Sequence, residues 1–243
     1  MDWIYGIHAV QTILKTTPQR VRELYVQRGR QDDRLQKIHK LAEQHGIALQ
    51  WVTVKQLGEK VDGRHQGVAA LCVQGETYDE NYLLQLVEQK GSRAFILVLD
   101  GVTDPHNLGA CLRSADGAGV DAVVVPKDNS VGLTPVVQKV ACGAAESIPL
   151  IVVTNIARTL EKLQQGGIWV VGTAGEADQY IYDIDLKGAL ALVMGAEGKG
   201  MRQLTRKQCD YLAKLPMAGE VSSLNVSVAT GICLFEVVRQ RRQ

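Results

Sequence analysis

The sequence predicts an α/β fold with a largely parallel sheet, preceded by a small α/β domain. Uninterrupted apolar runs are typical of parallel strands that helices cover on both faces. Here they alternate with segments of helical apolar spacing, the order expected of a parallel sheet. The 243 residues, 46% hydrophobic and 22% charged, can bury a core of this size. The apolar runs occupy residues 94–99, 122–125, 148–153, 168–171 and 190–194.

Residues 1–75 are expected to form the small domain, because helical and strand patterns alternate there. Apolar residues at helical spacing predict a helix around residues 7–14, and residues 21–26 have the pattern of a strand. A second helix is expected over residues 32–45, since Gly46 suits a helix end. Two more strands are expected at residues 48–52 and 67–73.

The larger domain is expected at residues 93–243, after a polar linker at residues 76–92 that contains few strand formers. Between its apolar runs, residues 135–142 and 156–164 predict helices. A last helix is expected over residues 225–239, with one apolar face. That face consists of Val228, Ile232, Phe235 and Val238.

The composition argues against several classes of protein. The sequence contains no run of about 18 apolar residues, the length needed to cross a membrane. Its first residues also lack the basic region and following apolar stretch of a secretion signal. The protein is therefore expected in the cytoplasm. A formal net charge of +1 does not decide whether it binds nucleic acid, because a local basic patch can hold phosphates without changing the total.

Neither the cysteines nor the histidines predict a metal site. The five cysteines are odd in number and far apart, and no C-x-x-C pair occurs. Reduced, buried thiols are expected at Cys72, Cys111, Cys142, Cys209 and Cys233. No metal-ligand spacing occurs among the histidines, which are His8, His39, His45, His65 and His106.

Three polar or glycine-rich segments of the larger domain could carry chemistry, since α/β proteins bind ligands at the carboxyl ends of strands. The first, residues 99–115, runs into a helix that is expected to start at Asp104-Pro105. Asn107 and Arg113 lie six residues apart and could reach one cavity. Either Arg113 holds a phosphate, or it is an ion-paired surface residue and Asn107 a helix cap.

The second segment, residues 192–201, contains three glycines that let backbone amides approach a ligand closely. It is not a Walker A loop, because no Ser or Thr follows its Gly-Lys and its glycines are too close together. It also lacks the G-x-G-x-x-G order, which disfavours a nucleotide-binding oxidoreductase. The alternative is a tight turn without a ligand, although packing does not explain Glu197.

The third segment, residues 215–231, precedes and opens the last helix. Ser222, Ser223 and Asn225 are all suitable helix N-caps, so a purely structural role would explain any one of them. Four hydroxyl or amide side chains within residues 222–227 nevertheless exceed what one cap needs.

In order and spacing, the three segments resemble the signature motifs of the SpoU, or TrmH-like, family of RNA ribose methyltransferases within the SPOUT superfamily. The first motif matches Asn107, Gly109 and Arg113, and the last matches Ser223-Leu224-Asn225. The glycine-glutamate motif between them matches Gly195, Glu197 and Gly198. The similarity extends from the first residues to the last helix.

This resemblance implies a SPOUT-type larger domain with a deep trefoil knot, a small ribosomal-protein-like RNA-binding domain and a homodimer. It also implies that S-adenosylmethionine binds within the knot. The residues implied for cofactor binding are Met194, Gly195, Leu215, Met217, Ser223 and Leu224.

The resemblance further implies 2′-O-methylation of a guanosine ribose in the peptidyl-transferase region of 23S rRNA, which would be the partner. A tRNA ribose methyltransferase and a non-catalytic RNA-binding or assembly protein are the alternatives. The implied catalytic residues are Asn107, Arg113, Glu197, Ser223 and Asn225.

Arg113 is a poor general base, because a guanidinium keeps its proton up to a pH above about 12. Our hypothesis is that Arg113 grips the target phosphate and stabilises the developing alkoxide. Glu197 would then either orient Arg113 or accept the proton, and the sequence leaves both roles open.

Seven cations lie within residues 20–40 and suggest a phosphate-binding surface on the small domain. An ordinary solvated face is the alternative, because Glu23, Asp32 and Asp33 dilute the charge. His65 is a further candidate for RNA contact. The cations are Arg20, Arg22, Arg28, Arg30, Arg34, Lys37 and Lys40.

Overall fold

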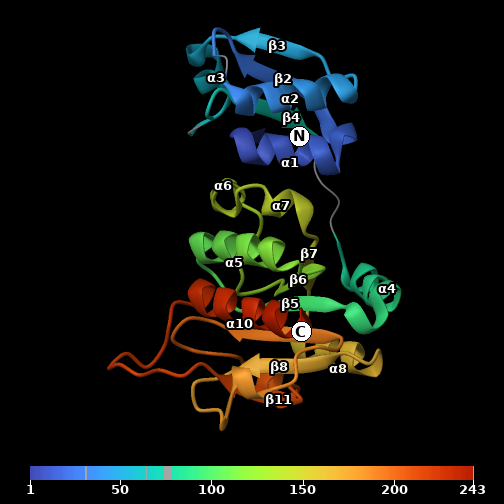
Figure 1. The fold of residues 1–243 in the computed structure, drawn as a ribbon, viewed down its shortest axis with the longest axis vertical. Helices are drawn as coiled ribbons and strands as arrows, with labels where there is room; N and C mark the ends of the chain where they lie inside the picture. The colour runs from blue at the N-terminus through green and yellow to red at the C-terminus, as the bar shows by residue number, and fades with distance from the viewer. Residues whose placement is uncertain (31, 64, 74–77, 243) are drawn as a thin grey trace. The chain divides into compact units, whose positions relative to one another are not determined.

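The computed structural model describes residues 1–30, 32–63, 65–73 and 78–242 and divides into two α/β units (Figure 1). One unit comprises Met1–Glu76 and Gln138–Ser147, and the other comprises Thr77–Val137 and Ile148–Gln243. The domain boundary predicted at residues 75 and 76 lies outside the described residues. Part of the predicted linker is helix α4 (Glu80–Lys90), whose Leu83 and Val87 belong to the core of the larger unit.

The smaller unit has a four-stranded sheet in the order β1-β4-β2-β3. The predicted helices and strands are confirmed as α1, β2, α2, β3 and β4, whereas β1 and α3 were not predicted. Helices α1 and α2 share a core with one face of the sheet, and α3 packs on the other face. The bounds are β1 (Asp2–Tyr5), α1 (Ile7–Thr16), β2 (Val21–Gln27), α2 (Asp33–Gln44), β3 (Leu49–Val52), α3 (Val54–Lys60) and β4 (Val68–Cys72).

The seven cations of residues 20–40 do not form one free surface. Arg20 pairs with Glu146 at 2.7 Å, and Arg30 pairs with Asp32 at 2.7 Å. Arg28 donates from Nε to the carbonyl of Trp51. The members that are exposed and not engaged in this way are Arg22, Arg34, Lys37 and Lys40.

The larger unit has a seven-stranded sheet in the order β7-β6-β5-β10-β8-β11-β9, and all its strand pairs are parallel. All five predicted apolar runs are strands of this sheet, which confirms the predicted fold class. The strands are β5 (Phe95–Asp100), β6 (Ala122–Pro126), β7 (Leu150–Val153), β8 (Trp169–Thr173), β9 (Gln179–Tyr180), β10 (Leu190–Gly195) and β11 (Tyr211–Lys214). The implied knot stays a prediction, although β10 does enter between β5 and β8.

Helices cover both faces of the large sheet (Figure 1). Buried residues of α4 and α8 form one core with alternate residues of β5, β6, β7 and β10. On the other face, α5 and α10 lie side by side. The helices of this unit, besides α4, are α5 (Pro105–Ala118), α8 (Ile156–Gln165), α9 (Gln203–Lys207) and α10 (Val226–Arg241). Helix α7 (Ala144–Ser147) belongs to the smaller unit, and the sequence of α6 (Pro135–Ala141) is divided between the two units. Within the described ranges, no helix has both the length and the apolarity needed to cross a bilayer.

The packing of α10 corrects one prediction. The face expected to be apolar points away from the core, since Val228 and Phe235 are each 51% exposed. The helix instead buries the neighbouring face, which includes Cys233, Leu234 and Val237.

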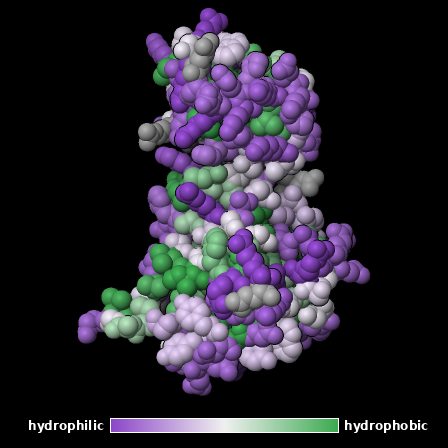
Figure 2. Space-filling model, viewed as in Figure 1, coloured by the Kyte–Doolittle hydropathy of each residue, from purple (hydrophilic) through white to green (hydrophobic). Residues whose placement is uncertain are grey.

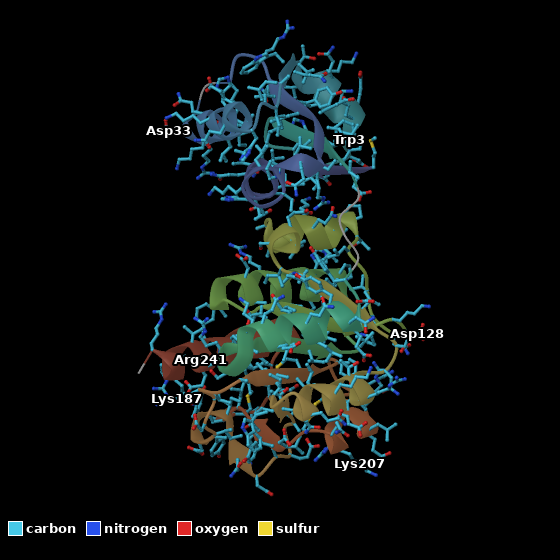
Figure 3. All side chains as sticks on the ribbon, turned by 90° about the vertical axis from the view of Figure 1, so that its right-hand side faces the viewer. Trp3, Asp33, Asp128, Lys187, Lys207 and Arg241 are labelled. Atoms are coloured by element: carbon cyan, nitrogen blue, oxygen red, sulfur yellow. The ribbon has the colours of Figure 1, made fainter. Side chains whose placement is uncertain are left out.

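The end of α10 is fixed by Arg241, which lies close to Lys187 in Figure 3. Its guanidinium donates to the carbonyls of Arg93, Ala94 and Gly188 and lies 4.7 Å from the centre of the Phe95 ring. Burial lowers the pKa of this guanidinium. These contacts attach the end of α10 to the residues that precede strands β5 and β10.

All five cysteines are free, but the expectation that all are buried is wrong. Cys142 is exposed and Cys209 is half-buried. Burial raises the pKa of the Cys111 thiol to about 11 and that of the Cys233 thiol to about 12. These two thiols are therefore protonated and unreactive near neutral pH.

Candidate functional site

The first two motifs meet because β5 and β10 are parallel neighbours. Gly195 at the end of β10 is paired in register with Asp100 at the end of β5. The Asp100 carboxylate is 1% exposed and accepts two bonds from Arg202, from the backbone N at 2.8 Å and from Nε at 2.7 Å. A buried carboxylate needs such donors, so this contact holds the chain that follows β10 against β5.

The glycine-rich motif forms a tight turn that lies directly against the end of its own strand. Ala196 and Gly200 exchange two backbone hydrogen bonds, of 3.1 and 2.8 Å. Gly200 adopts the left-handed conformation, with φ 66°. A Cβ atom on Gly195 would lie 2.3 Å from both the carbonyl carbon of Gly200 and the backbone N of Met201. Close backbone packing therefore requires glycine at position 195, whatever the turn binds.

Asp104, not Asn107, caps helix α5. Its Oδ1 accepts from the backbone N of His106 at 2.6 Å and of Asn107 at 3.0 Å, and Pro105 follows it, which confirms the expected helix start. The alternative interpretation of Asn107 as a cap is wrong. The Asn107 side chain is free to donate from Nδ2 to Glu197 Oε2, at 3.2 Å.

The third motif joins the same network through Asn225. This residue is the N-cap of α10 and accepts from the backbone N of Ser227 at 3.0 Å. Its Nδ2 also donates to Asn107 Oδ1 at 3.0 Å. Asn225 is therefore a helix cap, as the structural interpretation holds, and its side chain also contacts Asn107, so the cap does not exclude a functional role. We call the chain Glu197–Asn107–Asn225 the polar relay.

Arg113 lies on α5 and is exposed. Within the described ranges, no ion pair and no side-chain hydrogen bond joins its guanidinium to another residue. The alternative of an ion-paired surface residue is therefore not supported. Its guanidinium is available to a ligand, and the structure does not connect it to the polar relay.

A cavity of about 420 Å³ opens beside Glu197, within the usual size range of small-molecule sites. Its wall includes every residue implied for cofactor binding, from three segments of chain. Leu215, Met217 and Leu224 supply apolar surface, whereas Gly195 brings backbone close to the cavity. Ser223 also lines it, but Asn107, Arg113 and Asn225 do not. The lining therefore offers a ligand both apolar and polar contacts.

Sequence reasoning missed one wall of this cavity. The end of β8 and the chain that follows it, residues 173–176, line it together with Arg206 of α9. The rule that directed attention to the other motifs could have found residues 173–176, since they too follow the carboxyl end of a strand. Arg206 gave no such signal, because it lies in a short helix that no pattern predicted.

The comparisons with known proteins establish the class. Residues 94–235 match the SpoU rRNA Methylase family, and residues 3–78 match the RNA 2′-O ribose methyltransferase substrate-binding family. The chain belongs to the SpoU rRNA methylase family, which confirms the resemblance seen in its motifs.

Its relatives include two proteins named 23S rRNA (guanosine-2′-O-)-methyltransferase RlmB. The one from Pseudomonas putida is 59% identical over 242 residues, covering 100% of this chain and 98% of the relative. The one from Escherichia coli is 58% identical over 241 residues, covering 99% of each. The SpoU methyltransferase AviRb from Streptomyces viridochromogenes, crystallised with AdoMet, shares the fold, with a TM-score of 0.80 at 22% identity over 99% of this chain and 90% of AviRb.

The contact at Gly195 leads to a stability prediction. We expect Gly195→Ala to lower the free energy of unfolding by about 2–4 kcal/mol, because the methyl group would displace the turn backbone or strain it. Gly188→Ala is the matched control, since a Cβ there meets nothing within 4 Å, and it should change stability by less than about 0.5 kcal/mol. Urea unfolding measures both. Equal stability of the two variants would show that the close packing at Gly195 is not a constraint.

Proposed function

We propose that this chain transfers a methyl group from S-adenosylmethionine to the ribose 2′-oxygen of a guanosine in 23S rRNA. The observation that carries the proposal is the polar relay, which ends on Glu197 at the wall of the cavity. The full-length identity of 58–59% to relatives named RlmB supports the choice of substrate. Since 23S rRNA lies in the bacterial cytoplasm, the proposal also places the chain there.

The cofactor would occupy the cavity of the larger unit. S-adenosylmethionine supplies an electrophilic methyl group on its sulfonium sulfur. Leu215 and Leu224 would pack on the adenine, while Met194, Gly195, Met217 and Ser223 would complete the pocket. The fold shared with AviRb, crystallised with AdoMet, supports this assignment. We also propose that the larger unit contains the trefoil knot, which the chain on either side of β11 would form.

The reaction requires that a weakly acidic ribose hydroxyl lose its proton as it attacks. Glu197 is the only carboxylate of the polar relay, and the amide of Asn107 fixes one of its oxygens. This leaves its other oxygen to accept the proton. Arg113, which no described residue engages, would hold the target phosphate and balance the charge that develops on the 2′-oxygen. Asn225 and Ser223 would position the nucleotide.

The smaller unit would bring the RNA to the site. Its match to a substrate-binding family supports this role. Arg34, Lys37 and Lys40 are exposed on α2 and could contact phosphates, which gives affinity without sequence choice. His65 remains a candidate for a further contact with RNA.

We expect methyl transfer to 23S rRNA to depend on Arg113. Purified protein, labelled S-adenosylmethionine and undermethylated 23S rRNA should give one 2′-O-methylguanosine in the peptidyl-transferase region, located by ribose-methylation sequencing. Arg113→Ala should slow the transfer by about 100- to 1,000-fold, because one stabilising donor of the transition state is lost. Arg113→Lys should also be slow, since an ammonium cannot bind a phosphate through two parallel bonds.

The matched control is Arg158→Ala, which removes an exposed arginine from α8 on the opposite face of the sheet and should leave the rate unchanged. Total tRNA serves as the competing substrate. Label in tRNA alone would contradict the rRNA assignment but keep the chemistry. Cofactor binding without transfer to either RNA would favour a non-catalytic RNA-binding or assembly protein.

The exposed face of α10 supports a homodimer. Val228 and Phe235 are half-exposed, and Ile232 and Val238 of the same face are only partly covered. Figure 2 shows apolar surface at the start of α10 and on the connection before it. An apolar stripe of this kind on a helix of a folded unit commonly marks a protein interface. We propose that two copies of the chain associate through it.

We expect Phe235→Glu to convert the dimer to a monomer, because a carboxylate would be desolvated at the centre of the interface. In sedimentation velocity, the wild type should have twice the 26.5 kDa mass of one chain. The variant should have the mass of a single chain. Leu204→Glu is the control, since Leu204 is 67% exposed on α9 and should not affect assembly. A monomeric wild type would exclude the proposed dimer.

A further inference from the structure

The wall of the cavity that sequence reasoning missed carries an ion pair of opposite charges. Arg206 donates from Nη1 to Glu176 Oε1, and both residues line the cavity. Neither belongs to the three motifs or to the polar relay. Their charges therefore call for an explanation beyond the catalytic step.

Both charges are carried on anchored backbone. Glu176 lies in a turn closed by a hydrogen bond of 3.1 Å from Ala177 N to the carbonyl of Ala174. Ala177 is 4% exposed, and Ala174 N donates to the carbonyl of Ala213 on β11. Arg206 follows Thr205, which is 3% exposed and fixes α9 to the unit. The backbone of both residues is therefore held at the cavity wall, within reach of a ligand.

The fold itself gains little from this pair. The side chains of Arg206 and Glu176 are 39% and 60% exposed, and exposed ion pairs contribute little to stability. Breaking it would cost correspondingly little. A ligand that offers each partner a new opposite charge can therefore separate the two side chains without disturbing the unit.

We propose that Glu176 and Arg206 recognise the amino-acid end of the cofactor, with Glu176 binding its ammonium group and Arg206 its carboxylate. This inference rests on the proposed function and adds the residues that recognise the tail of S-adenosylmethionine. A zwitterion replaces one ion pair by two, and the guanidinium can bind a carboxylate through parallel hydrogen bonds. The apolar walls at Leu215, Met217 and Leu224 remain for the adenine.

The other charged residues of the cavity wall fit this role less well. Glu197 is held by the amide of Asn107 in the polar relay. Lys214 lies 5.2 Å from the centre of the Tyr180 ring, a cation–π contact. Lys199 lines the cavity but forms no ion pair within the described ranges, so it offers a positive charge without a negative one beside it. Among the described residues that line the cavity, Glu176 and Arg206 are the ion pair of opposite charge.

The test compares two ligands that differ in this tail. S-adenosylhomocysteine carries the amino acid, whereas 5′-methylthioadenosine has the same nucleoside and no amino acid. Calorimetric titration should show that Arg206→Met weakens S-adenosylhomocysteine by about tenfold or more and changes 5′-methylthioadenosine by less than about twofold. Glu176→Gln should act in the same direction, and Arg206→Lys should recover part of the loss.

Lys162→Met is the matched control, because Lys162 pairs with Glu80 in the same unit but does not line the cavity. It should change neither affinity. Undiminished binding of 5′-methylthioadenosine shows that a variant is folded. Equal loss of both ligands, or loss of neither, would overturn the assignment while the methyltransferase proposal stands. If the wild type binds neither ligand, the proposed function fails, and this inference fails with it.

Discussion

The close packing of the turn 195–201 on the end of β10 is the constraint on which the site depends. Position 195 has no room for a side chain, and the buried Asp100 carboxylate holds the far end of the turn through Arg202. Because β5 and β10 are parallel neighbours, this turn stands next to the start of α5. Glu197 therefore meets Asn107, and residues of the same turn line the cavity.

The N-cap residues of α5 and α10 also arrange the polar relay. Asn225 caps α10 with its oxygen and uses its nitrogen for Asn107. Asp104 caps α5 and so leaves the Asn107 side chain free for the polar relay. Arg113 and the pair Glu176–Arg206 differ from these residues, because Arg113 and Glu176 are exposed and Arg206 is half-buried. Side chains of this second kind can change partner when a ligand binds.

The sequence predicted the buried strands of the larger unit well, because strands covered on both faces need uninterrupted apolar runs. It missed β1, α3 and α4, whose short or half-exposed patterns resemble those of loops. It also misjudged α10, since an apolar stripe indicates burial without indicating whether the core or a second chain provides it. The motifs pointed to Asn107, Glu197 and Asn225, but only the structure shows their hydrogen bonds. Glu176 and Arg206 could not be paired from sequence, because their contact depends on a turn and a short helix that no pattern predicted.

In the proposed reaction, Asn107 and Glu197 act as one unit. A double-mutant cycle measures this coupling, with single-turnover rates of methyl transfer to 23S rRNA for Asn107→Ala, Glu197→Gln and the double variant. If the hydrogen bond between them positions the carboxylate, the double variant will be about as slow as the slower single variant. If the two losses instead multiply, Asn107 and Glu197 act independently and the polar relay is not the catalytic unit.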